Sequence, residues 1–150
     1  MATSDNSLLR TAGRWLLGAA LTGAGVTHLT TAREEFQAQV PGWIPVDADL
    51  VVVASGVVEV ALGMALVADR RHRETIGWLT GGFFVAIFPG NVTQYVEGTD
   101  AFGLDTDRAR LIRLFFQPVL VAWALWSTGA WRAWRRSRTA QDTAGEANTE

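Results

Sequence analysis

Polar side chains that can bind a ligand or exchange a proton interrupt the long apolar segments of this 150-residue chain. Such side chains are costly inside an apolar segment, so they tend to mark functional sites. Carboxylate and imidazole groups can exchange protons, whereas amide and guanidinium groups can hold the oxygen atoms of a ligand. The candidates for ligand binding or proton exchange are His28, Ser55, Glu59, Asn91, Arg113 and Gln117.

Helical spacing places several of these residues on shared faces. One face of the apolar segment 50–68 carries small or polar residues, which are Ser55, Gly56, Glu59 and Gly63. One face at the start of the last apolar segment carries three polar residues, which are Arg110, Arg113 and Gln117. If the two faces meet, Arg113 is the natural counter-ion of Glu59, because either charge alone in an apolar interior is strongly unfavourable.

Four of the six candidates also have a structural interpretation that needs no ligand. Glu59 could serve only as an ion-pair partner of Arg113, or as a neutral acid that is hydrogen-bonded to a carbonyl group. Arg113 could extend to the membrane surface as an anchor, and His28 could form an ordinary hydrogen bond there. Asn91 follows a Pro-Gly pair and could cap a broken helix.

The sequence argues against a metal, a haem or nucleic acid as a partner. The chain has no Cys, which excludes disulfides, thiolate metal sites and thiol chemistry by the chain itself. The two histidines, His28 and His72, are predicted on opposite sides of a membrane, which is unsuitable for a metal or a bis-histidine haem. The arginines over 132–138 are explained by anionic lipid headgroups. The residues form no complete catalytic constellation, so they leave open whether the chain is an enzyme.

Four apolar segments predict an all-α polytopic membrane protein, a four-transmembrane-helix bundle. The predicted helices span about 12–29, 50–68, 76–92 and 111–131, and Asp47 is well placed to cap the second. Pro89 with Gly90, and also Pro118, predict kinks or breaks. A soluble bundle fails as an alternative because its helices would need a polar side. We expect a transmembrane domain over 1–136 and, because periodicity is lacking, a disordered cytoplasmic tail over 137–150.

The arginines lie mainly on one side of the predicted helices. Of thirteen basic residues, nine precede the first helix, separate the second from the third, or follow the fourth. These nine are Arg10, Arg14, Arg70, Arg71, Arg73, Arg132, Arg135, Arg136 and Arg138. The positive-inside rule therefore places both termini in the cytoplasm and the candidate residues in the outer half of the bundle. The first outer loop contains an amphipathic stretch over 33–40 and an apolar Pro-Gly-Trp-Ile-Pro sequence, so we expect it to lie in the interface or over the bundle mouth.

Five short motifs occur in order along the chain. They are Gly-Ala-Gly-Val-Thr-His at 23–28, Val-Pro-Gly-Trp-Ile-Pro at 40–45, Ser-Gly-Val-Val-Glu at 55–59, Phe-Pro-Gly-Asn at 88–91 and Arg-Leu-Phe-Phe-Gln at 113–117. Together they resemble the DoxX family of small bacterial four-helix membrane proteins over about residues 14–131. The resemblance implies a multi-pass protein of the bacterial cytoplasmic membrane with a loose link to quinone-linked or thiol-linked redox systems. It carries over the same six candidate residues, and any thiol chemistry would belong to a partner.

Three functions are compatible with these patterns. The leading hypothesis is a membrane subunit that binds a small amphipathic ligand such as a quinone in an outer-half polar chamber and serves a redox partner protein. The second is a non-enzymatic scaffold or chaperone-like membrane protein whose polar cluster only fixes helix packing. The third is permeation of a small molecule or a proton. It ranks last because four short helices leave little room for alternating access unless the chain forms a homo-oligomer.

Overall fold

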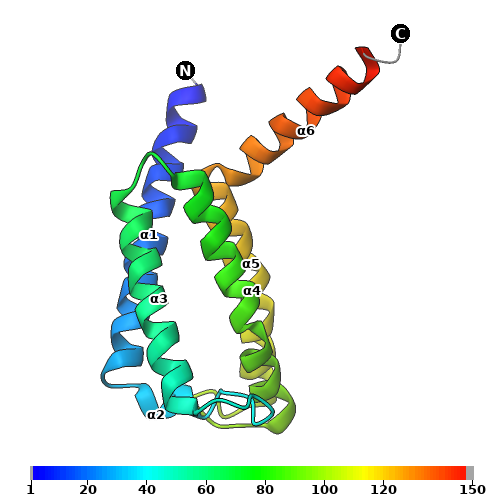
Figure 1. Ribbon diagram of the computed structural model, residues 1–150. Helices are drawn as coiled ribbons and strands as arrows, with labels where there is room; N and C mark the ends of the chain where they lie inside the picture. Colours follow the sequence, from blue (N-terminus) through cyan, green and yellow to red (C-terminus); the bar gives the residue numbers. More distant parts are fainter. Residues whose placement is uncertain (1, 148–150) are drawn as a thin grey trace.

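Six helices form the part of the chain that the computed structural model describes, residues 2–147, and this part contains no strand (Figure 1). The bundle consists of α1 (Ala2–Leu29), α3 (Ala48–Ala68), α4 (Arg73–Glu97) and α5 (Asp107–Thr128). The short helix α2 (Arg33–Gln37) lies in the connection between α1 and α3, and α6 (Ala130–Ala147) follows α5. The prediction of an all-α fold is therefore confirmed.

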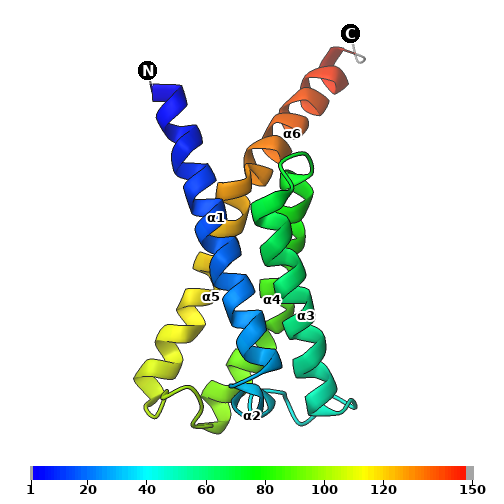
Figure 2. The same cartoon turned by 90° about the vertical axis from the view of Figure 1, so that its left-hand side faces the viewer.

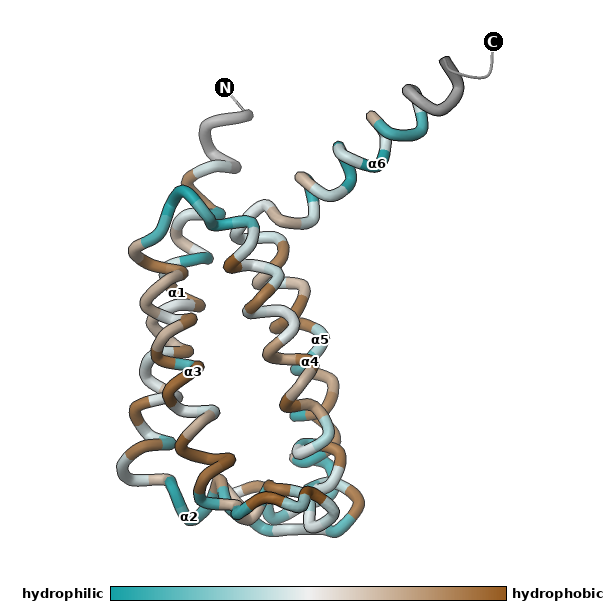
Figure 3. The backbone as a smooth tube through the Cα atoms, in the orientation of Figure 1, coloured by the Kyte–Doolittle hydropathy of each residue, from teal (hydrophilic) through white to brown (hydrophobic). Residues whose placement is uncertain are grey.

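Helices α3, α4 and α5 are each long and apolar enough to cross a membrane. Helix α1 is longer, but it carries Arg10 and Arg14 and begins with polar turns. Figure 3 shows hydrophobic residues along the middle of the bundle helices, and hydrophilic residues in the α3–α4 connection and in α6. Length and composition thus identify three helices that can cross a membrane, and a crossing by α1 as the fourth helix stays a prediction.

The bundle is built from two helix pairs. Helix α1 packs along α3, and α4 packs along α5, with fewer contacts between the pairs (Figures 1 and 2). One end holds the start of α6, the α3–α4 connection and a group of basic residues, and we call it the arginine-rich end. Its basic residues are Arg10, Arg14, Arg70, Arg73 and Arg132. The opposite end holds α2 and the α4–α5 connection, and we call it the loop end.

The apolar core joins the two pairs. Its buried members come from all four bundle helices and are Leu17, Leu21, Leu66, Ile76, Phe84 and Ala124. Two polar contacts add to this junction near the arginine-rich end. Nε1 of Trp123 donates to the carbonyl O of Gly13 at 3.0 Å, and Nη1 of Arg14 donates to the carbonyl O of Asp69 at 3.1 Å. Helix α1 is thereby fixed both to α5 and to the α3–α4 connection.

Glycines allow α1 and α3 to approach each other closely. A Cβ atom at Gly18 would lie 2.7 Å from the carbonyl O of Gly63, and one at Gly25 would lie 2.6 Å from the carbonyl O of Gly56. Small residues at both contacts let the two backbones touch, as in closely packed membrane helices. The small face predicted for α3 therefore packs against α1, and it does not meet the polar face of α5.

The ends of helices α4 and α5 differ from the sequence expectation. Helix α4 continues through Pro89 and Gly90 to Glu97, and α5 continues through Pro118, so neither proline ends its helix. Helix α5 ends at Thr128, earlier than expected, because Gly129 adopts a left-handed conformation with φ 81°. Glycine takes up this conformation without the steric penalty that a side chain would bring.

Helix α6 occupies most of the segment that we expected to be a disordered tail. It runs from Ala130 to Ala147 and points away from the bundle (Figure 1), whereas residues 148–150 lie outside the described part of the chain. The segment has no large apolar residue after Trp134, which is why apolar periodicity did not reveal it, but it is rich in Ala and Arg, which favour helices. Near its start the guanidinium of Arg138 lies 5.0 Å from the ring centre of Trp134.

We expect Gly25→Ala to destabilise the fold by about 1–3 kcal/mol, because the added methyl group would meet the backbone of α3. Gly23→Ala is the matched control, since a Cβ atom there would have nothing within 4 Å. This control should leave stability unchanged or raise it by up to about 1 kcal/mol. Unfolding of both purified variants in detergent, followed by circular dichroism, measures the difference. Equal stabilities would contradict the close helix contact.

Candidate functional site

A cavity of about 470 Å³, which we call the chamber, lies between the two helix pairs towards the loop end. The four bundle helices form its walls, and α2 with the segment 39–44 contributes to its lining at the loop end. All six residues singled out from the sequence line it, namely His28, Ser55, Glu59, Asn91, Arg113 and Gln117. The structure therefore brings the candidates together, and their use in binding stays a prediction.

His28 of α1 and Glu59 of α3 form a buried imidazole–carboxylate pair in the chamber wall. Nδ1 of His28 faces Oε2 of Glu59, and the two side chains are only 8% and 6% exposed. Neither of these atoms has a further hydrogen-bond partner among the described residues. An imidazole in contact with a carboxylate can pass a proton to it, so this pair is the group in the chamber best suited to proton exchange.

The close contact between α1 and α3 sets the geometry of this pair. A Cβ atom at Gly56 would lie 2.8 Å from Cβ of His28, and one at Gly25 would lie 2.9 Å from Cβ of Glu59. A larger residue at either glycine would push the helices apart at the point where the two side chains meet. The ring of His28 also packs against Phe36 of α2, which holds the imidazole from the loop end.

Arg113 does not partner Glu59, so the predicted ion pair between them is wrong. Nη2 of Arg113 instead donates to Oε1 of Gln39 at 3.2 Å, and its guanidinium lies 5.0 Å from the ring centre of Phe102. The physical reason is the pairing of the helices. Helix α3 packs on α1, so the partner of Glu59 comes from α1, whereas Arg113 belongs to the other helix pair.

A chain of amide hydrogen bonds connects Arg113 to the loop end. Nε2 of Gln39, whose carbonyl accepts from Arg113, donates to Oε1 of Gln94 at 2.7 Å. Nε2 of Gln94 in turn lies 3.4 Å from the carbonyl O atoms of both Thr99 and Ala101. Gln39 and Gln94 are both buried. This series of hydrogen bonds therefore fixes the orientation of Arg113 through groups that are shielded from water.

Asn91 of α4 and Gln117 of α5 are hydrogen-bonded within the second helix pair. Nδ2 of Asn91 donates to Oε1 of Gln117 at 3.0 Å, and Nε2 of Gln117 donates to the carbonyl O of Phe84 at 2.6 Å. Phe84 lies one residue before Val85, whose carbonyl loses its usual donor because Pro89 has no N–H. The two amides therefore fasten α4 to α5 in the turn that the proline weakens.

Ser55 contributes less polarity to the chamber than the other candidates. Its hydroxyl donates to the carbonyl O of Val52 in its own helix at 2.9 Å. Much of the remaining lining is apolar and includes Leu17, Leu21, Phe84, Phe116 and Leu120. The chamber thus combines a few polar groups with an apolar wall.

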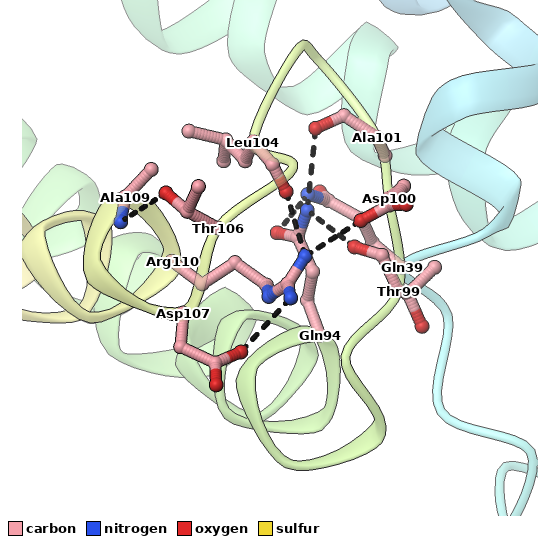
Figure 4. A network of polar contacts seen from close by, with 10 residues as sticks. All are labelled: Gln39, Gln94, Thr99, Asp100, Ala101, Leu104, Thr106, Asp107, Ala109 and Arg110. Atoms are coloured by element: carbon pink, nitrogen blue, oxygen red, sulfur yellow. Dashed lines mark hydrogen bonds and ion pairs between the residues drawn. The ribbon is translucent and has the colours of Figure 1, made fainter.

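A network centred on Arg110 holds the α4–α5 connection at the loop end (Figure 4). Nη1 of Arg110 donates to Oδ1 of Asp100 at 2.7 Å and to the carbonyl O of Leu104 at 2.8 Å, and Nη2 donates to Oδ1 of Asp107 at 2.9 Å. The arginine side chain is 7% exposed. Its Nη1 and Nη2 groups donate to the connection, and Arg110 does not line the chamber, so it has a structural role despite sharing a predicted face with Arg113.

Phe102 in the same connection is the only non-glycine residue of the described chain with a positive φ, which is 59°. This conformation is uncommon for a bulky residue and needs support from its surroundings. The backbone N–H of Phe102 donates to Oε2 of Glu35 at 2.7 Å, and its ring centre lies 4.4 Å from that of Phe36. Phe102 therefore links α2 to Arg113 next to the chamber.

Gln39 and Gln94 belong to the site but were missed in the sequence. Gln94 follows Asn91 by three residues on the same side of α4, and this spacing could have identified it. Gln39 gives no comparable signal because it lies in an irregular segment. That segment approaches α4 closely at Gly90, where a Cβ atom would lie 3.0 Å from the carbonyl O of Gln39.

The chamber offers hydrogen bonding and proton exchange. The guanidinium of Arg113 has five N–H donors, and Gln39 takes up one of them. The His28–Glu59 pair can both donate and accept a proton. Among residues 7–143, whose side chains the structure describes, no three His, Asp or Glu side chains lie close enough together to hold a metal ion.

We expect a double-mutant cycle to show coupling between His28 and Glu59. Either His28→Gln or Glu59→Gln alone disturbs a buried pair and should cost about 1–3 kcal/mol of stability, with a coupling of at least about 1 kcal/mol. Glu59→Gln and Arg113→Gln provide the matched comparison, and their effects should add within about 0.5 kcal/mol. Unfolding of all variants in one detergent measures both couplings. Strong coupling of Glu59 to Arg113, with none to His28, would refute the observed pairing.

Comparison with protein families finds the model described as "Domain of unknown function (DUF8561)", which matches residues 17–128. This range contains all six candidate residues. The DoxX family is not found, so the resemblance to it is wrong. Its five motifs consist largely of Gly, Pro and single polar residues, which closely packed helices and turns use in many unrelated proteins. Comparisons with curated proteins and with solved structures found no match.

Proposed function

The chain belongs to the family described as a domain of unknown function (DUF8561), and from its chamber we propose that it binds a small amphipathic molecule within a membrane. One observation carries this proposal. The chamber of about 470 Å³ combines an imidazole–carboxylate pair, a guanidinium group and three amides with a mainly apolar wall. Sites for small molecules have this size, and they are similarly apolar with a few placed polar groups.

Exposed apolar side chains support a membrane location. Met64 of α3 is 59% exposed, Leu79 of α4 is 58% exposed and Phe115 of α5 is 70% exposed. A surface with many such residues is unfavourable in water but favourable against lipid tails. We therefore propose that α1 crosses the membrane together with α3, α4 and α5, as a four-helix bundle.

The orientation follows from the arginine-rich end. Positive charge next to membrane-crossing helices favours the cytoplasmic side, so the start of α1 and the whole of α6 would lie in the cytoplasm. The chamber would then lie in the outer half of the bilayer. A cytoplasmic membrane fits this topology, whereas the assignment to bacteria depended on the DoxX resemblance and is dropped with it.

The polar groups suggest the class of ligand. Arg113 and the amides of Asn91 and Gln117 can donate hydrogen bonds to carbonyl oxygens on the ring of a ligand, and the pair of His28 and Glu59 can exchange a proton with a hydroxyl group of the ligand. Quinones and quinols combine such a polar head with an apolar body, so they are the first class to test. The link to a redox partner protein depended on the DoxX resemblance and does not form part of this proposal.

We expect decylubiquinone, a quinone with a short apolar chain, to bind the purified protein in detergent. Ala24→Trp places a large ring in the chamber and should weaken binding at least about tenfold. Ala54→Trp makes the same change at an exposed position of α3 outside the chamber, and should change binding less than about twofold. Equilibrium dialysis measures all three affinities. Binding that is insensitive to Ala24→Trp, or no binding by the wild type, would contradict a quinone in the chamber.

A purely structural role is the second candidate, and the amide contacts favour it. Asn91 bonds to Gln117, and Gln39 bonds to Gln94, so these groups satisfy one another without a ligand. A scaffold or chaperone-like membrane protein would need nothing more of them. In that case Ala24→Trp should raise the melting temperature by filling space, and the wild type should bind none of a panel of amphipathic molecules.

A further inference from the structure

An apolar groove of about 640 Å³ runs along α5, with residues of α4 beside it, and it is separate from the interior of the chamber. Its apolar lining includes Val85, Phe88, Val121, Leu125 and Trp126. Gln117 lies at one end, and Arg10 and Arg132 lie at the arginine-rich end. The groove therefore offers an apolar channel that finishes beside two positive charges.

A second cavity of about 540 Å³ adjoins the groove at the arginine-rich end. Five arginines contribute to its lining, and no acidic side chain does; they are Arg10, Arg14, Arg70, Arg73 and Arg132. None of the five forms an ion pair with a carboxylate in the part of the chain that the structure describes. Arg70 and Arg73 repel Arg14 more strongly than the carboxylate of Asp69 attracts it, so this cavity favours an anion.

Arg10 and Arg132 connect the two cavities, because both residues line the groove and also the basic cavity. Nη1 of Arg10 is buried and has no hydrogen-bond partner among the described residues. It lies near the break between α5 and α6, 3.9 Å from the position that a Cβ atom of Gly129 would take. A buried guanidinium nitrogen without a partner is unfavourable, and an anionic oxygen placed there would satisfy it.

We propose that this end of the protein binds one anionic phospholipid, with its phosphate between Arg10 and Arg132 and an acyl chain in the groove along α5. The charge of the basic cavity matches the headgroup, and the apolar groove matches the chain. The inference rests on the membrane location proposed above and does not depend on the ligand of the chamber.

Helix α6 supports a lipid as the source of the phosphate. Trp131 lines the groove, and its ring centre lies 4.8 Å from that of Trp134. Tryptophan favours the headgroup layer of a membrane, and neighbouring arginines attract anionic headgroups. Free phosphate would use the arginines but would leave the adjoining apolar groove without an occupant.

Native mass spectrometry of the full chain in detergent micelles tests the proposal, with phosphatidylglycerol and phosphatidylcholine of identical acyl chains in competition. The wild type should prefer phosphatidylglycerol. Arg10→Gln with Arg132→Gln should reduce this preference about 30-fold. Arg71→Gln with Arg108→Gln removes the same charge from exposed positions that line neither cavity, and should change the preference less than about threefold. Equal loss in both double variants would overturn a specific site.

Two further variants separate the headgroup from the acyl chain and from folding effects. Arg10→Lys with Arg132→Lys keeps both charges and should retain the preference, whereas Leu125→Trp narrows the groove and should weaken binding of both lipids. If the variant with Arg10→Gln and Arg132→Gln fails to fold, the lysine variant and Leu125→Trp test the proposal in its place. Unchanged lipid binding by Leu125→Trp overturns the proposal. Competition by inorganic phosphate at the lipid concentration would also overturn it. Ala24→Trp should leave the lipid preference unchanged. If this variant loses the preference, the lipid binds in the chamber, and the proposed site is wrong.

Discussion

The close approach of α1 to α3 is the constraint on which the candidate site depends. Gly25 and Gly56 let the two backbones touch, and this contact sets His28 beside Glu59. A buried carboxylate without a partner would be strongly unfavourable, so the imidazole–carboxylate pair and the glycine contacts favour the same alignment of the helices. Because the small face of α3 is used against α1, the polar groups of the second helix pair are satisfied by amides of that pair and by Gln39 of the connection between α2 and α3. The space between the pairs is left to the chamber.

The two halves of the bundle consequently have different characters. Towards the arginine-rich end, Leu17, Leu66 and Ala124 pack in the core that joins the pairs, and Trp123 adds a hydrogen bond to the backbone of α1. Towards the loop end the pairs are linked by polar contacts and by the segments that cover the chamber. A ligand between the pairs would therefore contact an apolar core on the side of the arginine-rich end and polar groups on the side of the loop end. The groove along α5 lies outside this division, which is why a lipid there and a ligand in the chamber can be tested separately.

Much of the fold followed from the sequence, because long apolar runs are a strong signal for helices. The cap on α3 was also predictable, and the backbone N–H of Leu50 does donate to Asp47 at 3.1 Å. Depth and helical spacing were enough to gather six candidate residues around one cavity. They were not enough to name the partner of Glu59, because spacing shows which residues share a helix face but not which helix that face meets. Gln39 could not be predicted as a site residue for a related reason. It lies in an irregular segment, which has no helical period from which the position of a side chain could be inferred. Likewise, α6 has no large apolar residue after Trp134 from which a helical period could be recognised.

The pairing of His28 with Glu59 can be measured directly in a lipid bilayer. The chain has two histidines, so ¹⁵N-labelled histidine in a His72→Gln background gives a single labelled ring, and ¹³C-labelled glutamate supplies the carboxyl carbons. Solid-state NMR dipolar recoupling should give a distance of about 3–4 Å from Nδ1 of His28 to a carboxyl carbon. That signal should disappear in Glu59→Gln. A signal that is absent in the parent protein, or that survives Glu59→Gln, would contradict the pairing and with it the arrangement of the chamber.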